Sequence, residues 1–360
     1  MRSVGAVLIG RNEGERLERA LRACCKQTDR VVYVDSGSTD GSVAYARSIG
    51  VEVVELDMDE PFTAARGRNA GAERLLGQHP DTTYVQFVDG DCELVPGWLE
   101  HGVIALEGND KLAVVCGRLR EVHPEHSVYN RLIDLEWDTP IGPAESCGGI
   151  AMFRISAFAD VGRFDATVAA GEEPELCMRL RAAGWLIERI DHDMAMHDAA
   201  ITKLSQWMRR SVRTGRGSLD LVTRFGDNGS GFGKIVKRAR LWGFCWPFLL
   251  LLGTLATGIG LGFAYGLGVG LAGAFAAMSL LIWPGLLKVA YGFLRGAMRG
   301  MPYSTAFYNA LLDLLSKFAE VWGQWGYMRD QKRGRTTRLI EYKNAPAATH
   351  DGAAVEAKQA

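Results

Sequence analysis

Two aspartates stand at the end of an apolar run: residues 84–88 are followed by Asp89, Gly90 and Asp91. The β-branched and aromatic residues of the run predict a buried strand, and the glycine predicts a turn at its end. Residues at i and i+2 of an extended chain point to one side, so the two carboxylates repel each other unless a cation lies near them. Mg²⁺ or Mn²⁺ accepts such ligands and keeps positions for substrate phosphates. The spacing therefore predicts a divalent metal site, with a solvated acidic turn as the alternative.

A second pair of carboxylates, Glu172 and Glu173, precedes Pro174 at the start of a predicted helix. Proline suits the first turn of a helix, and acidic residues stabilise its N-terminus, so a purely structural role is one interpretation. A carboxylate held at the rim of a crevice is also able to remove a proton from an attacking hydroxyl. Both interpretations stay open from composition alone.

Strands and helices alternate along the first 90 residues. This order predicts βαβ units and a mainly parallel sheet, in which ligands bind beyond the carboxyl ends of the strands. Asp35 and Asp89 both follow predicted strands, so we expect them to meet at one crevice. No G-x-G-x-x-G opens the first predicted helix and no P-loop motif occurs, which argues against a dinucleotide oxidoreductase and a P-loop ATPase. The predicted strands are residues 4–9, 30–34, 51–55 and 83–88, and the predicted helices are residues 15–25, 42–49 and 63–76.

The following segment is a mixture of elements. A helix is predicted at residues 98–106 and strands at residues 113–116 and 187–191, and residues 205–217 form a stretch rich in arginine. His197 stands just beyond the last of these strands. A lone histidine there is either a metal ligand or a surface side chain.

The ordered set of motifs resembles family 2 glycosyltransferases, which are inverting, metal-dependent enzymes on an α/β fold of the GT-A type. The resemblance covers roughly residues 4–220. It rests on residues 34–41 (VDSGSTDG), 65–71 with Arg68, 89–91 (DGD), 147–154, 161–165 (VGRFD), 171–173 (GEE) and 206–210 (QWMRR).

The resemblance implies roles for the donor side of the site. Asp35 would hold the nucleotide base or ribose with Arg68 nearby, and Asp89 would touch the ribose. Asp91 would coordinate the metal on the diphosphate, and His197 would complete that site. The nucleotide-sugar contacts expected in addition come from Asn12 and Glu13 in the first loop and from Gln206, Arg209 and Arg210.

The acceptor side follows from the same resemblance. Glu173 falls where the family most often has the aspartate that acts as general base, and Glu172 remains possible because a glutamate is one methylene longer. Gly148 and Gly149 would let the acceptor approach closely, since glycine suits close backbone approach.

The C-terminal part carries a membrane signal. Residues 241–287 contain no charged residue and no histidine, enough for two spans of about 20 residues each. Basic residues flank both ends, which predicts cytoplasmic ends at an inner (plasma) membrane. The predicted organisation is a cytosolic catalytic domain (1–225), a basic linker (226–240), a transmembrane hairpin (241–300), an amphipathic interfacial helix (301–330) and a basic, then disordered tail (331–360).

Charge and cysteine content argue against a nucleic-acid-binding, a disulfide-stabilised or a zinc-binding protein. The 360-residue chain has a formal net charge of -1, so nothing favours nucleic acid as a partner. Seven cysteines without C-x-x-C spacing, with Cys24 and Cys25 adjacent, predict reduced core thiols rather than disulfides or a zinc site.

The resemblance, together with the apolar C-terminal segment, implies transfer of a sugar from a nucleotide-diphospho-sugar to a lipid-linked, polyprenyl-type acceptor in cell-envelope or exopolysaccharide assembly. Membrane lipid is an expected partner. Two alternatives are a sugar nucleotidyltransferase, which shares a related fold but usually has a different first loop, and a non-catalytic nucleotide-sugar-binding scaffold of a membrane complex. Intact Asp89, Asp91 and Glu173 argue against the scaffold.

Overall fold

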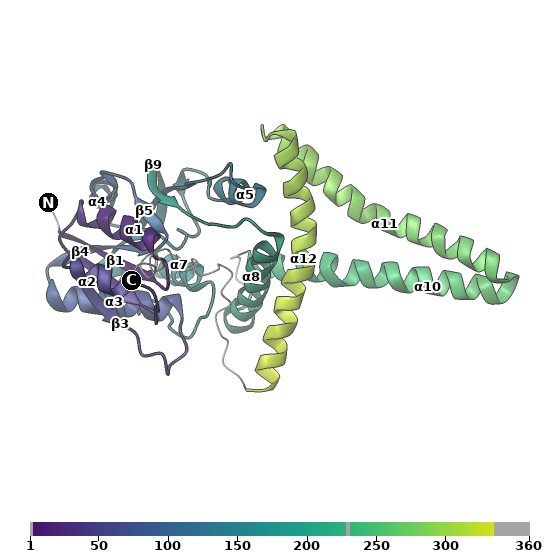
Figure 1. The fold of residues 1–360 in the computed structure, drawn as a ribbon, viewed down its shortest axis with the longest axis horizontal. Coiled ribbons are helices and arrows are strands. Elements are labelled where there is room, and N and C mark those ends of the chain that lie inside the picture. Colours follow the sequence, from purple (N-terminus) through teal and green to yellow (C-terminus); the bar gives the residue numbers. More distant parts are fainter. Residues whose placement is uncertain (1–2, 228–230, 335–360) are drawn as a thin grey trace, which may run out of the picture.

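The computed structural model describes residues 3–227 and 231–334. The predicted disordered tail lies mostly in residues 335–360, outside the described residues. A globular α/β domain is followed by a group of long helices (Figure 1).

The first half of the domain is a parallel βαβ arrangement, as the alternation of apolar and polar segments predicts. β1 lies between β2 and β4 and runs parallel to both, and β3 extends the sheet beyond β2. The pairing Gly10–Asp35 and the pairing Ile9–Asp89 bring the carboxyl ends of these strands to one edge. The elements are β1 (Ser3–Gly10), α1 (Glu15–Cys25), β2 (Val31–Asp35), α2 (Ser42–Ser48), β3 (Glu52–Glu55), α3 (Ala64–Gln78) and β4 (Thr82–Asp89).

The second half makes the sheet mixed rather than mainly parallel. Among the described residues the sheet has nine strands in the order β3-β2-β1-β4-β8-β6-β9-β5, with β7 paired to β9. β8 is antiparallel to both β4 and β6, because it enters the sheet from the opposite end. The elements are β5 (Cys92–Leu94), α4 (Trp98–Gly108), β6 (Leu112–Glu121), α5 (Val128–Glu136), β7 (Gly142–Pro143), β8 (Ala151–Arg154), α6 (Ile155–Asp160), α7 (Glu172–Ala182) and β9 (Leu186–His197).

Strand β9 is longer than the sequence predicts. The predicted short strand ends at residue 191, whereas β9 has twelve residues and ends at His197. Residues 191–193 are charged and exposed, which hides the strand in a hydropathy pattern. The extension continues because β9 pairs with β6 on one side and β5 on the other.

Helix α3 lies directly against the sheet and carries Arg68 to the site. A Cβ at Gly71 would lie 2.3 Å from Val7 Cγ1 and 2.8 Å from Val34 Cγ2, so only glycine permits this approach. Thr63 caps the helix by accepting a hydrogen bond from the Arg66 backbone amide, 3.1 Å away.

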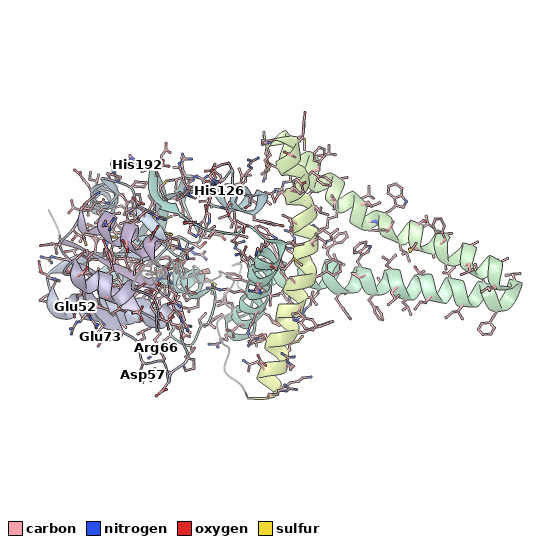
Figure 2. The ribbon with its side chains drawn as sticks, in the orientation of Figure 1. Glu52, Asp57, Arg66, Glu73, His126 and His192 are labelled. Carbon is pink, nitrogen blue, oxygen red and sulfur yellow. The ribbon has the colours of Figure 1, made fainter. Side chains whose placement is uncertain are left out.

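The C-terminal helices separate into two groups. α10 and α11 form an antiparallel hairpin that projects away from the domain, while α12 runs across its base beside α8 (Figure 1). The side chains of the hairpin project outward (Figure 2), and the two apolar segments are long enough to cross a membrane. The elements are α8 (Leu204–Phe225), α9 (Phe232–Arg240), the π-helical turn η1 (Leu241–Cys245), α10 (Trp246–Tyr265), α11 (Leu267–Met298) and α12 (Tyr303–Lys332).

All seven cysteines are free, as expected from their spacing. Cys25 and Cys245 are exposed, however, so the expectation that the adjacent pair lies in the core holds for Cys24 alone. Cys25 is the last residue of α1.

Candidate active site

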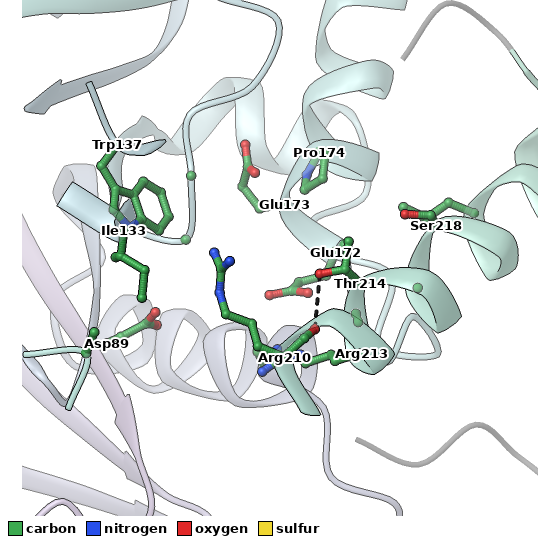
Figure 3. Close-up of a pocket in the computed structure, with 18 of the residues that line it drawn as sticks. Asp89, Ile133, Trp137, Glu172, Glu173, Pro174, Arg210, Arg213, Thr214 and Ser218 are labelled. Carbon is green, nitrogen blue, oxygen red and sulfur yellow. Dashed lines mark hydrogen bonds between the residues drawn. The ribbon is translucent and has the colours of Figure 1, made fainter. Parts of the chain in front are cut away.

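A cleft of about 390 Å³ opens where the carboxyl ends of the strands meet the N-terminus of α7 and one face of α8. Figure 3 shows Asp89, Glu172, Glu173 and Arg210 around this cleft. Of the predicted site residues, the structure places Arg68, Asp89, Asp91, Gly148, Gly149, Glu172, Glu173, His197 and Arg210 on its walls.

Arg68 holds two of these carboxylates together. Its Nη2 atom donates to Asp89 Oδ1 at 2.8 Å and its Nη1 atom donates to Glu172 Oε1 at 2.6 Å. The arginine is 2% exposed, and such burial opposes its charge, but Asp89 and Glu172 outweigh that cost and raise its pKa. Arg68 is therefore a fixed internal cation that links the end of β4 to the start of α7.

Neighbouring glutamates at the start of α7 have opposite environments. Burial disfavours the charged form of Glu172, yet Arg68 and then Arg213 overcome this effect and lower the pKa of its carboxyl group. For Glu173, burial prevails and raises the pKa, although hydrogen bonds from Cys177 and Cys147 oppose the change. Glu173 Oε1 accepts from the Cys147 backbone amide at 2.5 Å and from Cys177 Sγ at 3.0 Å. These differences make Glu173 the more basic of the two carboxylates.

Strand pairing brings Asp91 and His197 together. Cys92 is paired with His197 across β5 and β9, and Glu121 is paired with His197 across β6 and β9. Asp91 Oδ2 lies 3.7 Å from His197 Nε2, and Glu121 Oε2 lies 3.5 Å from His197 Nδ1. The Glu121 carboxylate therefore lies on the side of the ring away from Asp91, although the buried Nδ1 atom has no hydrogen-bond partner among the described residues.

The atoms of Asp91 and His197 fit a divalent cation. Asp91 Oδ2 and His197 Nε2 lie 3.7 Å apart, which is too long for a hydrogen bond, and a carboxylate and an imidazole are both ligands that a divalent metal would accept. Together with Cys92 Sγ they form a group whose atoms lie within 4.8 Å of one another. Burial raises the pKa of Cys92 well above its usual value, so its thiol donates to Asp91 Oδ1 instead of binding as a thiolate. Asp91 and His197 are thus the metal-holding residues that this geometry favours.

The glycine pair lies close to the carboxylates. Gly148 has a φ of +77°, and a Cβ there would lie 2.9 Å from the Trp137 ring. A Cβ at Gly149 would lie 3.1 Å from both Arg68 Nη2 and Asp89 Oδ2. Backbone without side chains therefore forms the wall beside Arg68 and Asp89.

The first two loops do not reach this cleft. Asp35 is 1% exposed, and its carboxylate accepts hydrogen bonds from the amides of Gly37 and Ser38 and from the Tyr33 hydroxyl. Asn12 Oδ1 accepts from the Thr39 amide at 2.7 Å and so joins the two loops. The structure gives both side chains a part in loop shape, and their nucleotide contact stays a prediction.

Glu13, in the first loop, lies nearer to the cleft than Asn12 and Asp35 do, because it contacts Gly90. It pairs with Arg16 at 2.8 Å, and its side chain lies against Gly90, between Asp89 and Asp91 in sequence. Its contact with nucleotide sugar likewise stays a prediction.

Of the three residues on α8 that were predicted to contact the diphosphate, one lines the cleft and two do not. Arg210 lines the cleft and donates to Glu136 at 2.8 Å. Gln206 Oε1 instead accepts from the amides of Thr202 and Lys203, at 3.0 Å each, and caps the helix. Arg209 is exposed and, among the described residues, is not part of the wall of the cleft. The predicted diphosphate contact is therefore favoured for Arg210 and not for Gln206 or Arg209.

Sequence reasoning missed Glu121, Trp137 and Arg213. Arg213 lines the cleft because it follows Arg210 by three residues on one helical face, a spacing that was available in the sequence. Trp137 lies edge-on to His197, with ring centroids 6.4 Å apart. Neither residue has a local sequence signal, because Glu121 reaches His197 through the pairing of β6 with β9 and Trp137 reaches it through packing of the two rings.

The pKa difference between the glutamates predicts the pH dependence of activity. A general base acts when ionised, so kcat/KM should rise with pH through the pKa of the base and then level off. If Glu173 is the base, the midpoint lies above the ordinary glutamate value of 4.5, because its pKa is raised. A midpoint below 4.5 would instead indicate Glu172, whose pKa is lowered. The measurement is kcat/KM across pH 3.5–8 at saturating metal.

Arg210 and Arg209 provide a matched pair of variants. Arg210→Ala should reduce kcat by a factor on the order of 10², as expected when one cationic group no longer faces a developing negative charge. Arg209→Ala should leave kcat nearly unchanged, since that side chain points to solvent. Thermal unfolding of both variants checks that the fold is retained. Equal losses of kcat would contradict the placement of Arg210, and not of Arg209, in the cleft.

Comparison with known proteins relates the N-terminal part of the chain to one family of enzymes. The model of glycosyl transferase family 2 matches residues 6–161. Glycosyltransferase AglE of Haloferax volcanii is 24% identical over 231 residues, which cover 61% of this chain and 73% of the relative. Pre-mycofactocin glycosyltransferase of Mycobacterium tuberculosis is 29% identical over 238 residues, which cover 63% of this chain. The match spans about half of that relative's length (49%).

Among solved structures, the mannosyltransferase PcManGT from Pyrobaculum calidifontis, in complex with GDP-Man and Mn²⁺, superposes with a TM-score of 0.54. The match covers 90% of this chain and 87% of that protein at 18% identity. This likeness concerns the fold, and it confirms the predicted GT-A architecture.

Proposed function

We propose that this chain, whose residues 6–161 match the model of glycosyl transferase family 2, transfers a sugar, with inversion, from a nucleotide-diphospho-sugar to a lipid-linked acceptor. Glycosyltransferase activity is the class to which the family model and the relatives assign it. The donor follows from the family, whereas the lipid acceptor rests on the C-terminal helices of this chain.

One observation carries the proposal. Two groups of side chains face the same cleft: Asp91 with His197 at the ends of adjoining strands, and Glu172 with Glu173 at the start of α7. Arg68 binds Glu172 and also Asp89, the last residue of β4, and so ties the end of that strand to the start of α7. Displacement at an anomeric carbon needs stabilisation of the leaving diphosphate and a base for the attacking hydroxyl, and this cleft offers both.

The donor side consists of metal ligands and cations. Asp91 and His197 would hold a divalent ion, for which Mn²⁺ in the mannosyltransferase neighbour is a precedent. The ion would neutralise charge on the diphosphate as the nucleotide leaves. Arg210 and Arg213 line the same cleft and add positive charge beside the leaving group.

The acceptor side consists of Glu173 and the glycine pair. Glu173 receives the acceptor proton, because its raised pKa makes it a stronger base than Glu172. Gly148 and Gly149 leave space for the acceptor beside Asp89. A base opposite the leaving group gives inversion in a single displacement, and no enzymic nucleophile is required.

The C-terminal helices suggest where the acceptor lies. α10 and α11 present long apolar surfaces, and α12 runs across their base with Trp322 and Trp325 exposed. Aromatic side chains at such a level are typical of the membrane–water interface. We therefore place the hairpin in an inner membrane, α12 at its surface and the catalytic domain on the cytoplasmic side. An acceptor carried by a lipid would then reach the cleft from the membrane, in envelope or exopolysaccharide assembly.

The test is a screen of nucleotide sugars with the purified full chain, with and without lipids that contain polyprenyl phosphate. The proposal expects nucleoside diphosphate to be released, with metal and lipid both required. Release of pyrophosphate from a nucleoside triphosphate and a sugar 1-phosphate would indicate a nucleotidyltransferase instead. Binding without any release across the screen would favour the non-catalytic scaffold.

A further inference from the structure

A second cavity, of about 460 Å³, lies where α9 and η1 meet α11 and α12. We call it the basic pocket, because five cationic side chains and one carboxylate are among its lining residues: Arg238, Lys288, Arg295, Arg299, Lys317 and Asp313. None of these residues lines the catalytic cleft. The proposed sugar transfer therefore gives these residues no part in the reaction, and the orientation of the hairpin alone does not require that they gather around one cavity.

The charges of the basic pocket are not balanced within the described residues. Lys288 and Lys317 both pair with Asp313, and Lys317 also pairs with Glu320 at 2.7 Å. The side chains of the three arginines make no hydrogen bond or ion pair with any described residue. Several guanidinium groups around one cavity attract an anion, and phosphate matches their planar donors.

The position of the basic pocket points to a lipid as the source of the phosphate. Residues 267–287 of α11 are free of charge and span about 30 Å, the thickness of a hydrocarbon core. Lys288 is the next residue, so the pocket begins where that apolar span ends. Trp242 and Tyr291 also line it, and Lys288 Nζ lies 5.7 Å from the Trp242 ring centroid. Aromatic and basic residues at this level are typical of a phospholipid headgroup region.

We propose that the basic pocket binds the phosphate headgroup of an anionic phospholipid. This inference rests on the membrane placement of the proposed function but concerns a site separate from the cleft. Bound there, the headgroup bridges α9, α11 and α12, since each contributes a cation to the pocket. It would fix the hairpin against the interfacial helix and so hold the catalytic domain at the membrane surface.

The test uses the full chain in detergent with phosphatidylglycerol, phosphatidylcholine or inorganic phosphate added, and measures binding by native mass spectrometry and thermal unfolding. Phosphatidylglycerol should bind and raise the unfolding temperature, and the double variant Arg295→Gln/Arg299→Gln should weaken this binding at least tenfold. Arg238→Gln, on a different wall, should weaken it independently. The control Lys234→Gln/Lys237→Gln removes two positive charges on α9 that lie outside the pocket and should bind normally.

Each contrary outcome overturns a defined part of the proposal. Equal binding of phosphatidylcholine would exclude recognition of an anionic headgroup. Equal binding of inorganic phosphate would show a site for free phosphate compounds instead of lipid. Unchanged binding in the arginine variants, or equal loss in the control, would show that the pocket is not the site. If nucleoside diphosphate release fails in the wild-type chain while these binding results hold, the proposed function fails and this inference stands.

Discussion

Replacement of Glu173 by glutamine should reduce kcat by a factor on the order of 10² to 10⁴, the usual contribution of a positioned general base. The amide is nearly the same size and keeps an oxygen that accepts from the Cys147 backbone amide, so the start of α7 should remain in place. What is lost is the ability to receive a proton from the acceptor. Donor affinity, measured by equilibrium binding of the nucleotide sugar, should stay close to the wild-type value.

Glu172→Gln is the informative comparison. Glu172 is the partner of buried Arg68, so its loss should lower the unfolding temperature and donor affinity more than loss of Glu173 does. Near-normal transfer by Glu173→Gln together with an inactive, folded Glu172→Gln would move the role of base to Glu172. If both variants stay active, the acceptor is already ionised, as a lipid phosphate would be, and needs no base.

Asp91→Asn should weaken metal-dependent nucleotide binding by a factor on the order of 100, at least the cost of losing an outer partner of a metal ligand. An asparagine has the same shape but lacks the charge that a divalent cation requires, and the strand pairing between β5 and β9 should survive. The measurement is calorimetric titration of nucleoside diphosphate at several Mn²⁺ concentrations, with thermal unfolding as a check on folding.

Asp193→Asn is the matched control for the metal site. Asp193 lies on β9 as His197 does, but it is half-exposed, pairs with Arg120 at 2.9 Å and does not line the cleft. Its replacement should leave the metal dependence intact. Unchanged metal dependence in Asp91→Asn, or an equal loss in Asp193→Asn, would contradict the assignment of Asp91.

The features predictable from the sequence are those that a short stretch of chain determines. Asp89 and Asp91 follow a strand whose apolar pattern is unmistakable, and a parallel sheet brings such ends together at one edge. The two glutamates before Pro174 likewise mark the start of a helix. In each case the local pattern and the tertiary structure agree, so sequence reasoning placed these residues at the cleft.

The features that escaped prediction depend on contacts distant in sequence. Glu121 reaches His197 because β6 and β9 are neighbours, a pairing that no local pattern specifies. Gln206 was expected to face the diphosphate, but the start of a helix leaves amides that its side chain satisfies. The Asp35 carboxylate accepts hydrogen bonds from the amides of Gly37 and Ser38 in its own loop, and its contact with the nucleotide stays a prediction. Polar side chains near an active site have these competing partners, and only the fold decides between them.

The central claim is transfer to a lipid, and transfer of radiolabelled sugar from its nucleotide donor into the organic phase of a lipid extract measures it most directly. The wild-type chain in membranes that contain polyprenyl phosphate should move the label into the lipid fraction only with a divalent cation, in step with nucleoside diphosphate release. Glu173→Gln should do so far more slowly unless the acceptor is already ionised. Label that stays in the aqueous phase, whether as free sugar or on a soluble acceptor, would contradict the account.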